Sequence, residues 1–363
     1  MTPFRVRRSV PRSSGPAART LTRAAVLGAV GAALVLPLAG SGAQAAPAAP
    51  RAERAYEAVT AWGSTPQVPW VVNGELRDGS QRIDLGLQDV YRVQRTSGGW
   101  LVVGNEDSSG SRAFLVRPDG SKTKLAGFPA TLAVSENGRR VAKADGEQRT
   151  KVTLHRQKDG KVIAARTFRF ADVLAVRGNR VLVSVSGRAG RTLWWNPGTD
   201  STRRVIKKPA ISADLSADRL ELLDPSGGPC DRTLVQLSRP RRVIAELGNL
   251  APTGWNATGD AMLLDECYFD EPYSRLAVVK TDPGYRTLAR VDSDDRGGDR
   301  FGRAVWESRK TWLRVRFDEK RTFVERCNKQ ATRCERATRR WPSDIDPIDG
   351  ALRSPQIVLG TLF

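Results

Sequence analysis

The stretch that decides the fold is TSGGWLVVGNEDSSGSRAFLVRPDGSKTKLAG, residues 96–127. It contains a Gly-Gly turn, an apolar strand at 100–103, a polar loop, a second strand at 113–116, and an Asp-Gly turn before a closing strand. An Asp-Gly pair between two apolar runs favours a tight hairpin, because both residues tolerate the backbone angles of a two-residue turn. The stretch therefore predicts one unit of an antiparallel sheet.

The same unit recurs along the chain. Its apolar strand reappears as WLVVG, VAKAD, VLVSV, LELLD, AMLLD and TWLRV, which begin at Trp100, Val141, Val181, Leu220, Ala261 and Trp312. These strands recur about every 40 residues, with a longer interval before the last, and helical periodicity is nearly absent after residue 66. Four short strands in a repeat of this length are typical of a β-propeller blade.

The turns between the strands indicate the number of blades. Turns of the Asp-Gly class occur seven times, whereas the turns before the apolar strands occur six times. The unmatched Asp-Gly turn lies in WVVNGELRDGSQRI, residues 70–83, and we expect 345–351 and 356–362 to supply the inner strands of its blade. The sequence thus predicts an all-β fold, a propeller of four-stranded antiparallel blades, seven rather than the alternative six, closed by pairing of N- and C-terminal strands.

Antiparallel order also sorts the connections between the two faces of the ring. The two classes of tight turn must lie on one face, and the remaining connections on the other. The second face, which we call the long-loop face, receives GNEDSSGSR, DPSGGPCDR, DECYFDEPYSR and VDSDDRGGDR. We expect a functional site on this face.

The repeat length, the strand pattern and the placement of the turns resemble the TolB-like and WD40-like β-propellers of exported bacterial proteins. The resemblance covers residues 68–362. SENG at 135–138 and SADR at 216–219 are the closest counterparts of the Ser-Pro-Asp-Gly turn of TolB-type repeats. The resemblance implies the propeller fold.

The first 45 residues differ in composition from the rest. They contain six arginines and no acid, then an apolar run at 24–38, then Ala-Gln-Ala at 43–45. This order is typical of a secretory signal peptide cleaved after Ala45, and the apolar run is too short to favour a membrane span. Arg7-Arg8 leaves twin-arginine export open beside general secretion.

These boundaries divide the chain into a signal peptide at 1–45, an Ala- and Pro-rich linker at 46–66 and a propeller domain at 67–363. We expect the mature chain to be secreted, or held in the periplasm or cell wall, and to contain no integral membrane segment.

The chain is basic, with a net charge of +20 over 363 residues and 40% apolar residues, which suffice for a sizeable core. Removal of the six leader arginines leaves 53 basic residues against 39 acidic ones, or +14. A basic exported protein attracts polyanions such as cell-wall polymers. The basic residues are scattered, with modest groupings at Arg203-Arg204, Lys207-Lys208, Arg241-Arg242 and Arg339-Arg340, so nucleic acid is not an expected partner. The alternative is a solvated basic surface.

Four cysteines, Cys230, Cys267, Cys327 and Cys334, suggest two disulfides in an exported chain, and three pairings are possible. Cys327 and Cys334 flank a short polar loop and could join one hairpin; Cys230 and Cys267 would then link adjacent blades. A zinc site is not indicated, because the spacings are wrong and the only histidine, His155, lies in a strand pattern.

Catalytic signatures are missing from the sequence: it contains no G-x-S-x-G elbow and no phosphate-binding loop. Carboxylates and aromatic residues instead gather in two long connections. We predict a binding site from Asp265, Glu266, Tyr268, Phe269, Asp270, Glu271, Asp292, Asp294, Asp295 and Asp299. Such a patch suits a cationic ligand or Ca²⁺, although 292–297 lacks the terminal Glu of a calcium loop; the alternative is that these acids keep exposed loops soluble.

Two functions remain open. The first is a non-enzymatic, monomeric scaffold without a metal or other cofactor, which binds a protein or polymer at the cell envelope or outside the cell. The second is a glycosidase or lyase that uses carboxylates on the long-loop face. The enzyme would require two carboxylates that converge in a central depression, at least one of them with a raised pKa.

Overall fold

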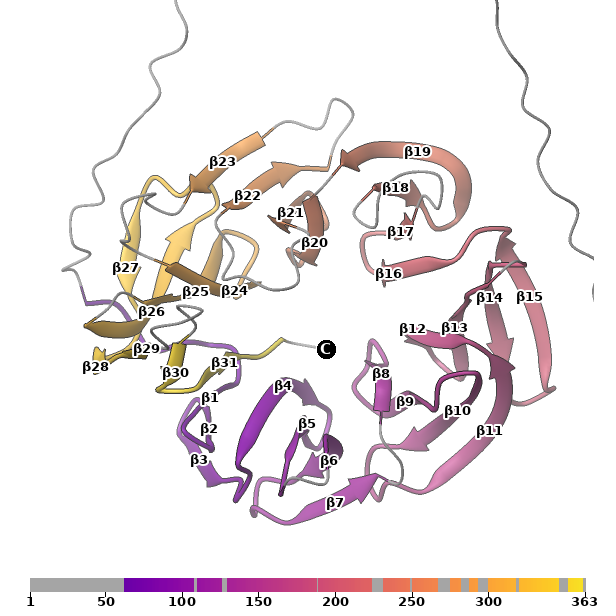
Figure 1. The fold of residues 1–363 in the computed structure, drawn as a ribbon, viewed down its shortest axis with the longest axis horizontal. Coiled ribbons are helices and arrows are strands. Elements are labelled where there is room, and N and C mark those ends of the chain that lie inside the picture. The colour runs from indigo at the N-terminus through magenta and orange to yellow at the C-terminus, as the bar shows by residue number, and fades with distance from the viewer. Residues whose placement is uncertain are drawn as a thin grey trace, which may run out of the picture. The chain divides into compact units, whose positions relative to one another are not determined.

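The chain forms a closed ring of seven β-sheet blades (Figure 1). The computed structural model describes residues 62–107, 110–125, 129–187, 189–223, 231–248, 250–266, 275–281, 287–292, 300–317, 320–345 and 352–361. All regular elements among these residues are strands, and none is a helix long and apolar enough to cross a membrane. The predicted seven-bladed propeller is confirmed.

Blades 2 to 7 each take four consecutive strands, which run in chain order from the ring axis outwards. Blade 2 contains β4 (Asp89–Thr96), β5 (Gly99–Asn105), β6 (Arg112–Val116) and β7 (Lys122–Leu125). Blade 3 contains β8 (Pro129–Val134), β9 (Arg140–Asp145), β10 (Arg149–Arg156) and β11 (Val162–Arg169). Blade 4 contains β12 (Ala171–Arg177), β13 (Arg180–Val185), β14 (Arg191–Asn196) and β15 (Ser201–Ile206).

The remaining consecutive blades follow the same plan. Blade 5 contains β16 (Ala210–Asp214), β17 (Arg219–Leu223), β18 (Arg232–Gln236) and β19 (Arg239–Gly248). Blade 6 contains β20 (Leu250–Trp255), β21 (Ala261–Glu266), β22 (Arg275–Lys280) and β23 (Thr287–Asp292). Blade 7 contains β24 (Arg300–Trp306), β25 (Thr311–Phe317), β26 (Arg321–Asn328) and β27 (Cys334–Arg336), and β28 (Trp341–Pro342) pairs with the other end of β26.

Blade 1 closes the ring with strands from both ends of the chain. The C-terminal β31 (Ile357–Leu359) pairs antiparallel with β1 (Trp70–Val72), which continues into β2 (Glu75–Asp78) and β3 (Gln81–Asp84). The closure is as predicted, but the division of the blade is not: three of its strands are N-terminal and a single strand is C-terminal. Of the predicted inner strand at 345–351, only Ile345 lies among the described residues. It belongs to β29 (Asp344–Ile345), which pairs with β30 (Leu352–Ser354) in a separate two-stranded sheet.

The reason for this difference is the Asn73-Gly74 pair inside the predicted hairpin. Both residues have positive φ angles, 48° and 78°, as the two central positions of a type I′ turn require. The pair therefore forms a tight turn of its own and divides 70–83 into three strands.

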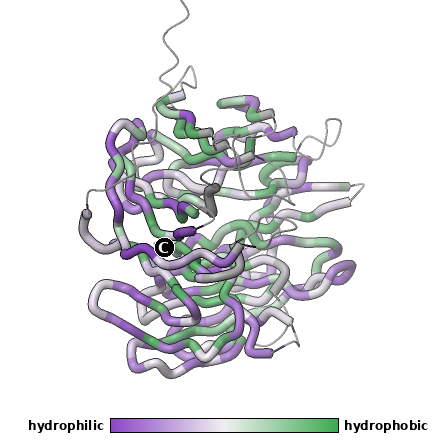
Figure 2. The backbone as a smooth tube through the Cα atoms, turned by 60° about the vertical axis from the view of Figure 1, so that its left-hand side comes forward, coloured by the Kyte–Doolittle hydropathy of each residue, from purple (hydrophilic) through white to green (hydrophobic). Residues whose placement is uncertain are grey.

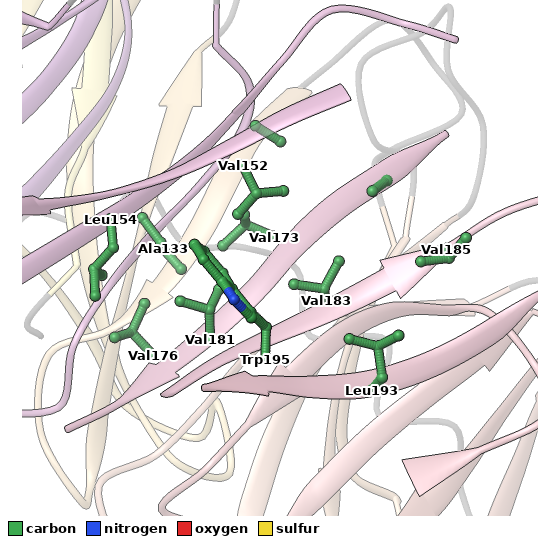
Figure 3. Packing of buried hydrophobic residues seen from close by; sticks show 13 residues of the cluster. Ala133, Val152, Leu154, Val173, Val176, Val181, Val183, Val185, Leu193 and Trp195 are labelled. Atoms are coloured by element: carbon green, nitrogen blue, oxygen red, sulfur yellow. The ribbon is translucent and has the colours of Figure 1, made fainter. Parts of the chain in front are cut away.

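Neighbouring blades pack face to face through apolar side chains. Between blades 3 and 4, Trp195 lies among Val152, Val173 and Val181 (Figure 3). The outermost strands are largely exposed, and β15 illustrates this along most of its length. Figure 2 shows hydrophobic stretches along the strands and hydrophilic colour at many of the turns.

Blade 7 contains buried charge. Glu325 is fully buried in β26 and accepts hydrogen bonds from Arg314 Nε (2.6 Å) and Arg316 Nη1 (3.3 Å) on β25. A disulfide joins Cys327 to Cys334 across the β26–β27 hairpin, which confirms that predicted link. Cys230 and Cys267 lie outside the described residues, so their pairing stays a prediction.

The first described residues dock on the outer edge of blade 7, although the sequence assigns them to the linker. The backbone N–H of Gly63 donates to the Arg336 carbonyl (2.9 Å). The Arg326 guanidinium donates to the carbonyls of Ser64 (2.8 Å) and Thr65 (3.0 Å). This segment therefore covers part of an edge strand that would otherwise expose unpaired backbone groups.

Candidate functional site

The inner strands of blades 2 to 7 share a feature that the sequence did not reveal. Each contains a β-bulge, close to its N-terminal end or its middle, where its pairing with the second strand skips one residue in blades 2 to 6 and two residues in blade 7. In blades 2 to 6 the skipped residues are Tyr91, Ala130, Leu174, Ile211 and Thr253. A bulge bends its strand and redirects a side chain.

Two of these bulge residues are unusually exposed. Tyr91 is 52% exposed and Ile211 is 39% exposed, and they are two of six large apolar side chains exposed among the residues that the structure describes. Leu174 and Thr253 are half-buried. The innermost strands border the ring axis (Figure 1), so these bulge residues lie on the strands nearest the axis. We call Tyr91, Leu174, Ile211 and Thr253 the axial surface.

A cavity of about 300 Å³ lies beside Tyr91, where β4 meets β31. It forms at the seam between the two ends of the chain, since Thr361 after β31 exchanges backbone hydrogen bonds with Arg95 and Val93 of β4. Its lining is mainly aliphatic and comprises Val90, Tyr91, Arg92, Val93, Val315, Gln356, Ile357, Val358, Leu359 and Thr361.

The polar side chains of this cavity are held by neighbouring groups. The Tyr91 hydroxyl accepts a hydrogen bond from Asn105 Nδ2 (2.7 Å). Arg92 Nη1 donates to the Leu132 carbonyl on the inner strand of blade 3 (3.0 Å). Gln356 Oε1 accepts from the Val90 backbone N–H (3.0 Å). The site is thus preorganised, with one cation, one amide and two hydroxyls around an aliphatic interior, a composition suited to binding.

One carboxylate near the axis has a perturbed pKa. Asp172 lies on β12, and burial raises its pKa, while a hydrogen bond with the Thr131 side chain acts in the opposite direction. Its hydrogen-bond partner is a hydroxyl group and not a second acid, so Asp172 shows one half of the carboxylate pair that a glycosidase requires.

The predicted acidic site falls largely outside the described residues. Tyr268, Phe269, Asp270, Glu271, Asp294, Asp295 and Asp299 lie there, so their binding role stays a prediction. Asp265 and Glu266, which we expected in a loop, end strand β21, and the Asp265 side chain is only 2% exposed. The strand continues further because Asp265 pairs in register with Leu276 of β22.

The structure does bring Asp265 and Asp292 to one end of blade 6. Asp265 pairs with Leu276, and Leu276 pairs with Val291, the residue before Asp292. The two acidic connections therefore leave blade 6 on the same face, as the topology argument required.

One group of potential metal ligands occurs among the described residues. Glu325, Cys327 and Cys334 have ligand atoms within 4.8 Å of one another. Both sulfur atoms are joined in the disulfide, so they are not thiolate ligands, and the Glu325 carboxylate is engaged by Arg314 and Arg316. We assign no metal to this group. His155 lies in β10, as predicted.

The described residues thus form a seven-bladed β-propeller with a small cavity beside Tyr91, which we call the axial cavity. No family model and no curated protein sequence matches the chain. Among solved structures it is similar to the β-propeller domain of Cps50 (Swd1) from Myceliophteria thermophila, with 11% identity, a TM-score of 0.49, and coverage of 72% of this chain and 90% of that one.

Two further solved structures are similar over much of the chain. TolB from Acinetobacter baumannii has 12% identity and a TM-score of 0.43, with 75% of this chain and 68% of that one covered. Prolyl oligopeptidase B from Galerina marginata has 10% identity and a TM-score of 0.49, with 78% and 46% covered. These likenesses concern the fold alone.

Proposed function

We propose that this chain is an exported, non-enzymatic β-propeller that binds a protein partner at the cell envelope or outside the cell, through the axial surface. The observation that carries the proposal is the set of inner-strand bulges, which leave Tyr91 and Ile211 exposed on strands that border the axis. Exposed aromatic side chains on a rigid frame are frequent anchors of protein interfaces.

The size of the axial cavity favours a protein segment. About 300 Å³ is at the lower limit for pockets that enclose a small-molecule ligand, and it suits one or two inserted side chains. The aliphatic lining would accept an apolar side chain, and Arg92 at its edge adds a positive charge. Because these groups are fixed before binding, little side-chain ordering would oppose association.

Export is supported by two features. The leader has the order of a signal peptide, and the Cys327–Cys334 disulfide is compatible with an oxidising compartment.

The partner is tested by crosslinking in the envelope fraction of the source cells. We expect Tyr91→Ala with Ile211→Ala to remove a specific crosslinked protein, by about ten-fold or more, since interface anchors of this kind contribute about 2 kcal/mol or more. The control is Ile163→Ala with Val243→Ala, which shortens two apolar side chains of similar exposure on the outer strands β11 and β19. Equal loss in both variants, or no loss in either, would contradict an axial site.

The alternative function, a glycosidase or lyase, has one supporting observation in the raised pKa of Asp172. It predicts that purified protein releases reducing ends from cell-wall glycans and that Asp172→Asn abolishes the release. We expect no release from either form. Release by the wild-type protein that disappears in Asp172→Asn would establish the enzyme in place of the scaffold.

A further inference from the structure

Positive charge gathers on the outer strands of two adjoining blades. We call Arg203, Arg204 and Lys207 at β15, together with Arg239, Arg241 and Arg242 on β19, the basic rim. All six side chains are exposed. Among the ion pairs of the described residues, none involves any of the six.

Some basic residues elsewhere on the outer strands and turns have acidic partners. Lys124 on β7 pairs with Glu106, and Arg166 on β11 pairs with Asp200 (3.1 Å). Arg156 at the end of β10 pairs with Asp159 in the turn before β11 (2.5 Å). None of the six basic-rim residues is in such a pair within the part of the chain that the structure describes. Single basic residues outside the ion pairs also occur on other outer strands, such as Arg82 on β3 and Arg169 on β11. The basic rim differs from these strands in its neighbouring arginines.

One apolar cluster connects the two strands of the basic rim. Val205 and Ile206 of β15 pack against the apolar cluster that contains Leu237, and Leu237 lies in the turn that leads into β19. β15 and β19 follow one another around the outside of the ring (Figure 1). Burial lowers the pKa of Arg219 at the base of this region, and the positive charge of Arg242 lowers it further.

Protection of edge strands is a simpler explanation for basic residues on an outer strand, because Lys and Arg discourage pairing with another chain. Edge protection needs only a charge or two on each strand. It does not account for two adjoining strands that each contain neighbouring arginines, Arg203-Arg204 and Arg241-Arg242, outside the ion pairs of the described residues.

We propose that the basic rim is a docking surface for a linear phosphodiester polymer. Five of the six residues are arginines, whose planar guanidinium groups can bind phosphate oxygens through two hydrogen bonds at once. The rim follows the convex outside of the ring, so a flexible chain can lie along both strands, whereas a flat membrane would touch it along a line. The inference rests on the proposed export for access to such a polymer, and the binding itself can be measured without it.

The experiment uses the whole mature chain and poly(glycerol phosphate) as the probe, with affinity measured by calorimetry over a series of salt concentrations. We expect the affinity for the polymer to fall as the salt concentration rises. The variant R203Q/R204Q/R241Q/R242Q should bind about ten-fold more weakly or worse than wild type. Its affinity should also depend less steeply on salt, because fewer counterions are released.

A matched control removes the same charge elsewhere. R82Q/R139Q/R309Q/K310Q neutralises four exposed basic residues away from the basic rim, and we expect its affinity to stay within about three-fold of wild type. If both variants lost affinity equally, the binding would depend on net charge alone, and the proposal would be overturned. An absence of polymer binding at low salt would also overturn it. The same holds if the protein binds polygalacturonate or phosphatidylglycerol vesicles as tightly as poly(glycerol phosphate), or more tightly.

The result is separable from the test of the proposed function. The variant Tyr91→Ala with Ile211→Ala should lose the axial crosslink but keeps all six residues of the basic rim. Its affinity for the polymer should therefore equal that of wild type. Polymer binding that disappears with the axial variant would overturn the assignment to the basic rim.

Discussion

Two buried regions of the molecule contain different kinds of side chain. The interface between blades 3 and 4 is apolar, whereas blade 7 buries charged groups. Around Trp195 the buried side chains are aliphatic, and they come from six strands of two blades (Figure 3). In blade 7, Glu325 is fully buried between Arg314 and Arg316, and Arg326 is held by Glu307 and Glu335. The first region packs two complete blades together, while the second is where extra segments of the chain dock.

This difference suggests what the buried charges do. The Arg326 guanidinium reaches the carbonyls of Ser64 and Thr65, and so connects the docked N-terminal segment to β26. A buried ion pair is seldom more stabilising than apolar packing, because desolvation offsets its attraction. Its directional hydrogen bonds can nevertheless specify which segment docks and in which register. We infer that blade 7 uses charge for specificity, and that the interface of blades 3 and 4 uses apolar area for stability.

The largest test of this comparison is Glu325→Ala. The change leaves Arg314 and Arg316 buried without their shared carboxylate, and we expect the free energy of unfolding to fall by about 3–5 kcal/mol. Denaturation in urea measures the loss. The control is a triple replacement, Glu325→Leu with Arg314→Met and Arg316→Leu, which we expect to recover most of it. A triple variant as unstable as Glu325→Ala would show that the ion pairs are themselves the source of stability in blade 7.

A smaller effect is expected from Trp195→Phe on the apolar side. The change removes part of a buried ring and the hydrogen bond from Trp195 Nε1 to Asp200 Oδ1 (2.9 Å). We expect a loss of about 1–3 kcal/mol in the free energy of unfolding, mainly from the cavity, because the exposed Asp200 carboxylate keeps its bond with Arg166. Val183→Ala in the same cluster isolates the packing contribution. A loss above that of Glu325→Ala would reverse the proposed order of the two regions.

Sequence reasoning found the blades because turn chemistry and strand periodicity are local properties. The Asp-Gly turns and the apolar strands that begin at Trp100 and Val181 are visible in short windows. The division of blade 1 was missed although its signal, Asn73-Gly74, was present. The stretch also resembles the hairpin of the other repeats, which contains one tight turn, whereas residues 70–83 contain two.

The axial surface and the buried charges could not be read in the same way. A bulge depends on how β4 pairs with β5, and no residue type marks it, so Tyr91 looks like an ordinary strand aromatic. Arg314 and Glu325 look like surface residues until two strands place them opposite each other in the register of β25 and β26. These features arise from pairing between strands, which the composition of a single strand does not encode.

The smallest expected effect is the pH dependence of stability at His155, which lies on the face of blade 3 turned away from Trp195. His155 is 2% exposed there; its Nδ1 lies 2.9 Å from the Gly160 carbonyl, which can only accept, and its Nε2 lies 2.9 Å from Thr153 Oγ1. This pattern fits a neutral ring with the proton on Nδ1. Burial lowers the pKa of His155 below its usual 6.5, nearby Lys143 lowers it further, and the Gly160 carbonyl and Asp145 partly offset this by raising it.

The sign of the expected effect follows from the lowered pKa. As the pH falls below about 6.5, the histidine of the unfolded chain binds a proton before the folded one does, so stability declines until the pH reaches the folded pKa. The slope should be at most about 1.4 kcal/mol for each pH unit. Subtracting the curve of His155→Gln from that of the wild type, by urea denaturation between about pH 7 and 5, isolates this residue from the carboxylates that both proteins share. A flat difference would mean that the buried ring takes up a proton as readily as an exposed one, and that this polar face of blade 3 tolerates charge as blade 7 does.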